Sequence, residues 1–245
     1  MSTLSLGLRF SAFSQSDQGE PFNKTELERY LRTARVVSVQ KSAVGGKTAP
    51  WVVQLHDGKI ARRGFFKHVH RSRPSPLADS YQYEIAAYEL DKLLDFNIVP
   101  PVVERAIEKE KGSLQVFLED CITERDRKKT NIQPPNPKRF QESLDEIRVF
   151  ENLVYNKCQN LEDTHIHKTT WKVCRVDFSE SFAPSPDLIP GCEITFCSER
   201  IFQNLRNLDL PTLQSVLSPY LNADEIKALL ERRNKILEKL EGLQK

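Results

Sequence analysis

Two hydrophobic patterns follow one another along this chain, and their order constrains its fold more than any other feature. β-branched and aromatic residues typical of strands dominate residues 36–121, whereas apolar residues at helical spacing dominate residues 140–245. The stretch between them, residues 122–139, reads ITERDRKKTNIQPPNPKR and is so charged and proline-rich that no regular element is expected in it. Strands first and helices second predict an α+β fold, with a β-rich N-lobe, a linker or insertion, and a helical C-lobe.

Local signals refine the first part of the chain. Residues 1–35 are predicted to be a polar leader followed by a short helix, because Asn23 stands at an N-cap position and Glu26 follows three residues later. An Asp-Gly pair at Asp57 predicts a hairpin turn between two strands. Residues 80–96 have apolar side chains at helical spacing and predict a helix inside the β-rich part.

The second part of the chain carries the strongest helix signals. Residues 143–156 are amphipathic, and longer helices are predicted over residues 198–217 and 222–243. Asn222 is expected to cap the last helix, whose first turn is acidic as the helix macrodipole favours. Between these helices, residues 169–182 predict a short strand pair or a strand and a turn.

Composition excludes several classes of protein. At 245 residues, with 39% hydrophobic residues and a negative mean hydropathy, the chain is typical of a soluble globular protein. Its net charge of +2 is too small to indicate nucleic acid or an anionic membrane as a partner. No apolar run approaches the roughly 20 residues that span a bilayer, so no membrane span is expected.

The cysteines bear on localisation. Their number is odd and no CxxC pair occurs, which suits a reducing compartment better than a disulfide framework. The N-terminal residues lack a signal-peptide pattern, so a cytoplasmic protein is expected, with a processed secreted form as the alternative. The five cysteines are Cys121, Cys158, Cys174, Cys192 and Cys197.

Two segments of the β-rich part have features that suit phosphate binding. Lys67 ends a predicted strand and Glu84 lies on the following helix, so an ion pair could hold the lysine over a phosphate. The alternative is a solvated strand end and a solvated helix face. Gly45 and Gly46, in AVGGKTA, could let backbone amides approach phosphates. This loop lacks Walker A spacing and could equally be a plain hairpin.

A polar stretch in the helical part is the other candidate site. Residues 153–167 read LVYNKCQNLEDTHIH, and Asp177 follows ten residues later in an isolated VDF. The stretch is either a surface loop or a site for a metal and phosphate. A zinc site is an alternative, because thiolate and imidazole suit zinc, but the spacing matches no common structural zinc site. Its ligands would be Cys158, His165, His167 and Cys174.

The order and spacing of five segments carry a resemblance to a known superfamily. These segments are GFFK, DSYQYEIAAYELDKLLDFNIVPPVVER, GSLQVFLED, RVFENLVYNKCQNLED and WKVCRVDFSESF. Together they resemble the atypical kinase-like fold shared by Golgi casein kinase-type enzymes, phosphatidylinositol kinases and HipA-type kinases, and look closest to an uncharacterised bacterial branch. The resemblance runs from about Val36 to the C-terminus and implies a two-lobed protein-kinase-like fold that binds ATP and Mg²⁺.

The resemblance also implies roles for individual residues. Lys67 matches the lysine that contacts the nucleotide phosphates, and Glu84 matches its helix partner. Asp177 matches the metal-binding aspartate, and Asp163 stands where the family has a metal-binding asparagine, so both are expected to be Mg²⁺ ligands. The segment between the lobes, expected to hold adenine through its backbone, comprises Val116, Phe117, Leu118 and Glu119.

The catalytic-loop pattern of the family, N-x-D-R-N-x-x-N, is only partly kept. Asn156 and Asn160 match it, but Cys158 replaces the catalytic aspartate and Gln159 replaces the arginine. A thiol is mostly protonated at neutral pH and substitutes poorly for a carboxylate that orients the acceptor hydroxyl. Cys158 and Asn160 are therefore the candidate catalytic residues, and phosphotransfer is expected to be impaired or altered because the catalytic carboxylate is missing.

The sequence predicts a nucleotide- and Mg²⁺-binding kinase-like protein, a pseudokinase or an atypical phosphotransferase. One alternative is an active atypical kinase that acts on a protein or a small-molecule hydroxyl. Another is a non-catalytic module that binds protein or nucleic acid. The basic stretch at residues 62–73 could stack on single-stranded nucleic acid or hold an acidic peptide, but the pattern favours a strand with an outer basic face.

Overall fold

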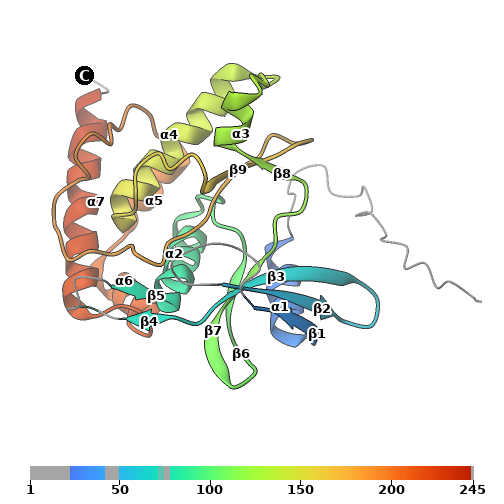
Figure 1. Cartoon of the computed structure of the whole chain (residues 1–245). Helices are drawn as coiled ribbons and strands as arrows, with labels where there is room; N and C mark the ends of the chain where they lie inside the picture. Colours follow the sequence, from blue (N-terminus) through green and yellow to red (C-terminus); the bar gives the residue numbers. More distant parts are fainter. Residues whose placement is uncertain (1–22, 42–49, 72, 74–77, 244–245) are drawn as a thin grey trace, which may run out of the picture.

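The structure, a computed structural model, describes residues 23–41, 50–71, 73 and 78–243. The first lobe is built on a five-stranded antiparallel sheet with the order β1-β2-β3-β7-β6. Figure 1 shows this sheet and α1 gathered on one side of the molecule, with α4, α5 and α7 on the other and α2 between them. The strands are β1 (Arg35–Gln40), β2 (Trp51–His56), β3 (Ala61–Lys67), β6 (Val102–Ile107) and β7 (Glu110–Val116).

Helix α1 (Lys24–Thr33) covers the sheet. The predicted cap is confirmed, because Asn23 Oδ1 accepts a hydrogen bond of 3.2 Å from the Glu26 amide. The apolar face of α1 is buried in one cluster with the inner face of the sheet, including Phe66 and Leu114. The predicted turn between β2 and β3 is also confirmed, since Asp57 Oδ1 accepts from the amide of Ile60 at 2.8 Å.

Helix α2 (Tyr81–Leu94) connects the two parts of the molecule. Ser80 caps it, accepting from the Gln82 amide at 3.1 Å, and most of its residues are buried because it contacts the sheet on one side and α5 and α6 on the other. Asp95 ends the helix in a left-handed conformation, with φ of 55°. Two short strands precede it, β4 (His70–Arg71) and β5 (Asp79–Ser80).

The second lobe contains helices and a small sheet of order β10-β9-β8, packed around a second large cluster of buried apolar residues. This arrangement confirms the predicted α+β class. Within the described residues, none of the helices has the length and apolar character needed to cross a membrane. The elements are β8 (Cys121–Thr123), α3 (Glu124–Lys129), α4 (Pro137–Val154), β9 (Thr164–His167), β10 (Val173–Arg175), α5 (Glu199–Asn207), α6 (Leu210–Leu217) and α7 (Ala223–Leu243).

The expectation that residues 122–139 hold no regular element is wrong. Strand β8 and helix α3 occupy the first part of this stretch, because Thr123 Oγ1 caps α3 by accepting from the Asp126 amide at 3.0 Å. Arg127 and Glu124 add an ion pair of 2.6 Å along the same helix. The prolines lie only in the later part, where Pro137 takes the first turn of α4 and needs no hydrogen-bond donor.

The continuous helix predicted over residues 198–217 is in fact two helices. The chain leaves the helical conformation at Leu208, and Asp209 caps α6 by accepting from the Thr212 amide at 2.9 Å. Pro211, in the first turn of α6, cannot donate a backbone hydrogen bond, so a helix could not run through this point. The last helix is confirmed, since Asn222 Oδ1 accepts from the Glu225 amide at 3.0 Å.

Candidate functional site

A buried lysine links the two lobes. Lys67 ends β3, and its Nζ contacts Oε1 of Glu84 on α2 and lies 2.7 Å from Oδ1 of Asp177 in the second lobe. The Ser80 cap places Glu84 in the first turn of α2, on the side that faces the sheet. The structure therefore brings three sequence-predicted residues into one group, which we call the lysine triad (Lys67, Glu84 and Asp177).

The electrostatics of the lysine triad favour its charged form. Burial alone disfavours an ammonium ion, but the carboxylates of Glu84 and Asp177 outweigh this and raise the pKa of Lys67. Burial acts against ionisation of Asp177 as well, but the Lys67 charge outweighs it and lowers the pKa of Asp177. The side chain of Asp177 is 46% exposed while that of Lys67 is 14% exposed, so the aspartate forms the accessible end of the triad.

The backbone around Asp177 is held from three sides. Asp177 has a φ of 66°, in the left-handed region, and its carbonyl accepts from Asn156 Nδ2 at 3.1 Å. The next amide, of Phe178, donates to Oε2 of Glu84 at 3.2 Å. The Phe178 ring is buried and packs edge-on against Phe150 of α4, with ring centroids 5.7 Å apart. Glu84 therefore fixes both the lysine and the segment that carries Asp177.

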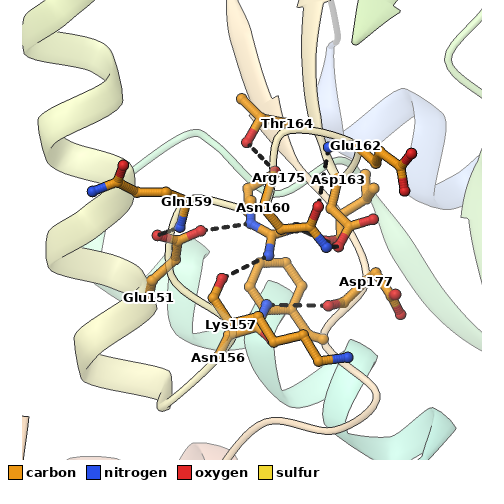
Figure 2. A network of polar contacts seen from close by, with 12 residues as sticks. Glu151, Asn156, Lys157, Gln159, Asn160, Glu162, Asp163, Thr164, Arg175 and Asp177 are labelled. Atoms are coloured by element: carbon orange, nitrogen blue, oxygen red, sulfur yellow. Dashed lines mark hydrogen bonds and ion pairs between the residues drawn. The ribbon is translucent and has the colours of Figure 1, made fainter. Parts of the chain in front are cut away.

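The polar stretch at residues 153–167 comprises the end of α4, an ordered loop over residues 155–163 and strand β9 (Figure 2). Asn160 is bound at both ends, because its Nδ2 donates to Oδ2 of Asp163 and its Oδ1 accepts from the Glu162 amide at 3.0 Å. The carbonyl of Asp163 accepts from the Val176 amide at 3.0 Å, which ties the loop to the segment before Asp177. Asn160, Asp163 and Asp177 thus belong to one hydrogen-bonded unit.

A buried arginine that the sequence analysis did not single out organises this loop. The side chain of Arg175, on β10, is fully buried, and its Nε lies 2.8 Å from Oε1 of Glu151 on α4. Its Nη1 lies 3.3 Å from Oδ2 of Asp163, and its Nη2 donates to the carbonyl of Lys157 at 3.2 Å. Figure 2 shows Arg175 between these groups. An arginine in the apolar run VCRV, and a glutamate among apolar residues of α4, were the signals available for this pair.

The carboxyl group of Asp163 has a pKa well above its ordinary value. Burial raises its pKa to about 6, and the negative charge of Asp177 adds to this effect, while Arg175 opposes it. Within the described residues, Asp163 Oδ1 and Asp177 Oδ2 accept no hydrogen bond. Two crowded carboxylates, each with one oxygen left, are a donor set that suits a hard cation such as Mg²⁺.

The expectation of free cysteines is wrong for one pair. Cys158 forms a disulfide with Cys192, 34 residues further along the chain, so its sulfur is not available as a thiolate base. The pairing arises because the segment after Asp177 folds back over α4, where the Asn152 side chain holds the Cys192 carbonyl at 3.1 Å and the Ile189 amide at 2.9 Å. Disulfides persist in oxidising compartments, so the cysteines no longer support the cytoplasmic expectation.

The zinc alternative is not supported by the geometry. Among the described residues, the cluster of potential metal ligands is Glu151, Cys158 and Cys192, and its two sulfurs are bonded to each other. His165 and His167 lie on β9, opposite Cys174 of β10 and Cys121 of β8 respectively. Because these side chains do not converge with Cys158 on one point, the four predicted ligands form no common site.

In the segment between the lobes, some of the backbone amides are already hydrogen-bonded within the protein. The amides of Val116 and Phe117 both donate at 3.1 Å, to the carbonyls of Pro101 and Arg63. Glu119 forms an ion pair with Arg63, whose guanidinium lies 3.9 Å from the centre of the Phe117 ring. Of the four residues predicted to face adenine, Leu118 and Glu119 have backbone amides that donate to no other backbone group within the described part of the chain. The other predicted nucleotide-binding residues, Gly45 and Gly46, lie outside the described residues.

Comparison with solved structures shows which proteins have a similar fold. The sequence matches no protein-family model and no curated protein. The structure is similar to the Helicobacter pylori proinflammatory kinase CtkA, with a TM-score of 0.54 and 9% identity over 87% of this chain and 95% of the kinase. It is also similar to CtTel1 in its C2-symmetric dimer, with a TM-score of 0.50 and 11% identity over 88% of this chain but only 12% of CtTel1.

At these identities the similarity concerns the fold. The chain has the two-lobed kinase-like fold, which confirms the predicted fold class. The lysine triad spans the two lobes of this fold, and the loop with Asn160 and Asp163 lies beside it in the second lobe.

The buried ion pair of the site can be measured by a double-mutant cycle. Arg175→Met leaves Glu151 buried without its partner, so we expect the free energy of unfolding to fall by about 3 to 5 kcal/mol. Adding Glu151→Gln should recover part of this loss. Arg125→Met, which breaks an exposed ion pair with Glu162 near the same loop, should cost less than about 1 kcal/mol. Urea unfolding measures the wild type, these three variants and the single Glu151→Gln that completes the cycle, and equal losses for Arg175→Met and Arg125→Met would contradict the assigned role.

The raised pKa of Asp163 gives a pH-dependent prediction. Its pKa is about 6 in the folded chain against an ordinary 3.8, so the folded state binds this proton more tightly and stability falls as the pH rises between these values. Asp163→Asn removes the charge, and we expect it to stabilise the chain at pH 7.5 by roughly 2 kcal/mol. The gain should shrink at pH 4.5 in urea unfolding, and the exposed control Asp187→Asn should show no gain. A destabilised Asp163→Asn at pH 7.5 would refute this.

Proposed function

We propose that this chain is a kinase-like protein that binds ATP and Mg²⁺ between its lobes and whose phosphotransfer is impaired or altered. The observation that carries the proposal is the lysine triad, in which a buried ammonium from the first lobe is held against a half-exposed carboxylate of the second. A surface ion pair would not need this burial or the second carboxylate. The kinase-like fold supports the same proposal.

Nucleotide binding would use the triad by exchanging one partner of the lysine. Glu84 keeps Lys67 in place, while the contact between Lys67 and Asp177, at 2.7 Å, gives way to a phosphate oxygen. A compact ammonium suits this role because it neutralises phosphate charge without a fixed geometry. The exchange releases Asp177 Oδ1 and explains why the lysine needs two carboxylates before the nucleotide arrives. The adenine would take backbone groups of Leu118 and Glu119, and the loop with Gly45 and Gly46 is proposed to approach the phosphates.

The residues proposed to hold Mg²⁺ are Asp163 and Asp177. Their mutual repulsion contributes to the raised pKa of Asp163, and a cation between them would relieve it. Bound there, Mg²⁺ would neutralise charge on the nucleotide phosphates. Arg175 acts as a positioning residue, because it holds Asp163 Oδ2 while leaving Oδ1 directed elsewhere.

The impaired or altered chemistry is inferred from Cys158. The position at which kinases of this type keep a carboxylate holds a sulfur that is already bonded to Cys192. A disulfide sulfur neither accepts nor orients a proton at neutral pH, which favours a pseudokinase.

An atypical phosphotransferase acting on a protein or small-molecule hydroxyl is the second candidate. It is supported by Asp163, whose pKa of about 6 lies close to neutral pH, and by the fact that phosphoryl transfer depends mainly on positioning and charge.

Nucleotide binding is tested by thermal unfolding with ATP and Mg²⁺. At about 100 times the dissociation constant, ligand binding should stabilise the chain by about 2.7 kcal/mol. We expect this gain to disappear in Lys67→Ala, because the phosphate loses its counter-charge. The control Lys59→Ala, an exposed lysine of the same lobe, should keep it. Absence of stabilisation in the wild type, or an equal gain in both variants, would contradict the proposal.

The two candidate functions separate in a turnover experiment. With radiolabelled ATP we expect no phosphotransfer or ATP hydrolysis by the wild type, and a gain of activity in Cys158→Asp combined with Cys192→Ser. The matched control is Cys158→Ser with Cys192→Ser, which opens the same disulfide without supplying a carboxylate. Wild-type turnover that is lost in Asp177→Asn would instead identify an active atypical kinase.

A further inference from the structure

A cavity of about 410 Å³ lies in the second lobe and contains no residue of the lysine triad. It is formed by the loop after α2, the start of α4, the turn between β9 and β10, and Arg200 of α5. Its size falls within the range of small-molecule sites, roughly 300 to 1,000 Å³. The residues that give it chemical character are Phe96, Phe140, Trp171, Arg139, Lys172 and Arg200.

Trp171 in this cavity has an unfavourable backbone conformation. Its φ is 60°, in the left-handed region that glycine or asparagine adopts readily and a bulky side chain does not. The turn itself fixes this conformation, because the Trp171 amide donates to the His167 carbonyl at 2.9 Å and the His167 amide donates to the Lys172 carbonyl at 3.0 Å. Residues held in such conformations cost about 1 to 3 kcal/mol. A glycine would make the same turn without this cost, so the indole has a role that offsets it.

The indole packs against the main core cluster on one side and, because it is only partly buried, also forms part of the aromatic wall of the cavity. Trp171 is only partly buried, and its ring meets Phe140 edge-on with centroids 5.8 Å apart. The Phe140 ring is itself contacted by Arg127, whose guanidinium lies 5.0 Å from the ring centre. Because Phe140 is only 8% exposed, the partly buried indole provides more of the aromatic surface against which a planar ligand can pack.

The basic residues that line the cavity favour an aromatic ligand with a negative charge. The residues that line the cavity include three basic ones, Arg139, Lys172 and Arg200, and one acidic one, Glu146. Arg200 is neutralised by Asp95 at 2.6 Å, but within the described part of the chain the Arg139 guanidinium has no hydrogen-bond or ion-pair partner. A guanidinium fork matches the two oxygens of a carboxylate better than it matches a neutral group.

We propose that this cavity binds a small planar aromatic carboxylate. The ring of the ligand packs against Trp171 and Phe140, and its carboxylate pairs with Arg139. Three separate observations support this ligand class. They are the unfavourable backbone conformation of Trp171, the aromatic wall of the cavity and the Arg139 guanidinium without a partner among the described residues. The site does not depend on nucleotide binding, because none of its residues belongs to the lysine triad or to the loop around Asp163.

The two tryptophans of the chain make the proposal measurable. Trp51→Phe leaves Trp171 as the only indole fluorophore, and titration with benzoate, phenylacetate and 1-naphthoate should then give saturable quenching at millimolar concentrations or below. The matching amides should bind at least about tenfold more weakly, which corresponds to 1.4 kcal/mol. Arg139→Gln should cause the same loss. The neighbouring Lys138→Gln is the control, since Lys138 does not line the cavity.

Saturation-transfer NMR on the otherwise wild-type chain provides an independent measurement if Trp51→Phe does not fold. Trp171→Gly should abolish saturation transfer to all three carboxylates while leaving stabilisation by ATP and Mg²⁺ unchanged. The proposal is overturned if no carboxylate shows saturable binding up to about 10 mM, if carboxylates and amides bind alike, or if Arg139→Gln binds as the wild type does. Unaltered binding by Trp171→Gly would assign the indole to packing and would overturn it as well.

Discussion

The ion pair between Arg175 and Glu151 is the interaction on which the candidate site depends. Both side chains are fully buried, at 0% exposure, so neither charge can be left without the other at an acceptable cost. The same guanidinium also holds Asp163 and the carbonyl of Lys157. Helix α4, the loop after it and β10 are thereby fixed relative to one another, and Asp177 follows two residues after the arginine.

The lysine triad extends this fixed unit across the two lobes. Glu84 contacts Lys67 of the sheet and also accepts from the amide of Phe178, next to Asp177. One carboxylate on α2 therefore aligns a cation of the first lobe with an anion of the second. Burial, together with the negative charge of Asp177, raises the pKa of Asp163, so the charged carboxylate is kept in the site at some expense of stability.

Buried contacts also fix the segment that follows Asp177. Arg232 of α7 is fully buried and has no carboxylate partner among the described residues; its guanidinium donates instead to carbonyls of Leu153 and Ala183, both at 2.9 Å. Together with the Cys158–Cys192 disulfide, it fixes the segment against α4 and beside the loop. The disulfide and these hydrogen bonds hold the segment in place next to the loop that carries Asn160 and Asp163.

The sequence by itself determined local features of the structure. The caps at Asn23 and Asn222, the turn at Asp57 and the helical spacing of α2 follow from hydrogen bonds within a few residues, and all were predicted correctly. The order and spacing of five segments also indicated the kinase-like fold, and the ion pair between Lys67 and Glu84 was expected, whereas the contact between Lys67 and Asp177 was not. The single helix expected over residues 198–217 and the irregular stretch expected over residues 122–139 were wrong where a cap competed with the overall pattern.

Only the tertiary structure decided which distant groups meet. The pairing of Cys158 with Cys192 and of Arg175 with Glu151 joins residues 34 and 24 positions apart, and nothing in the spacing of these residues specifies either pair. The physical reason is that a buried charge or thiol takes its partner from whatever the fold brings into the same desolvated space. Periodicity and capping record a residue's own neighbours along the chain, whereas burial and ion pairing depend on how the two lobes close around them.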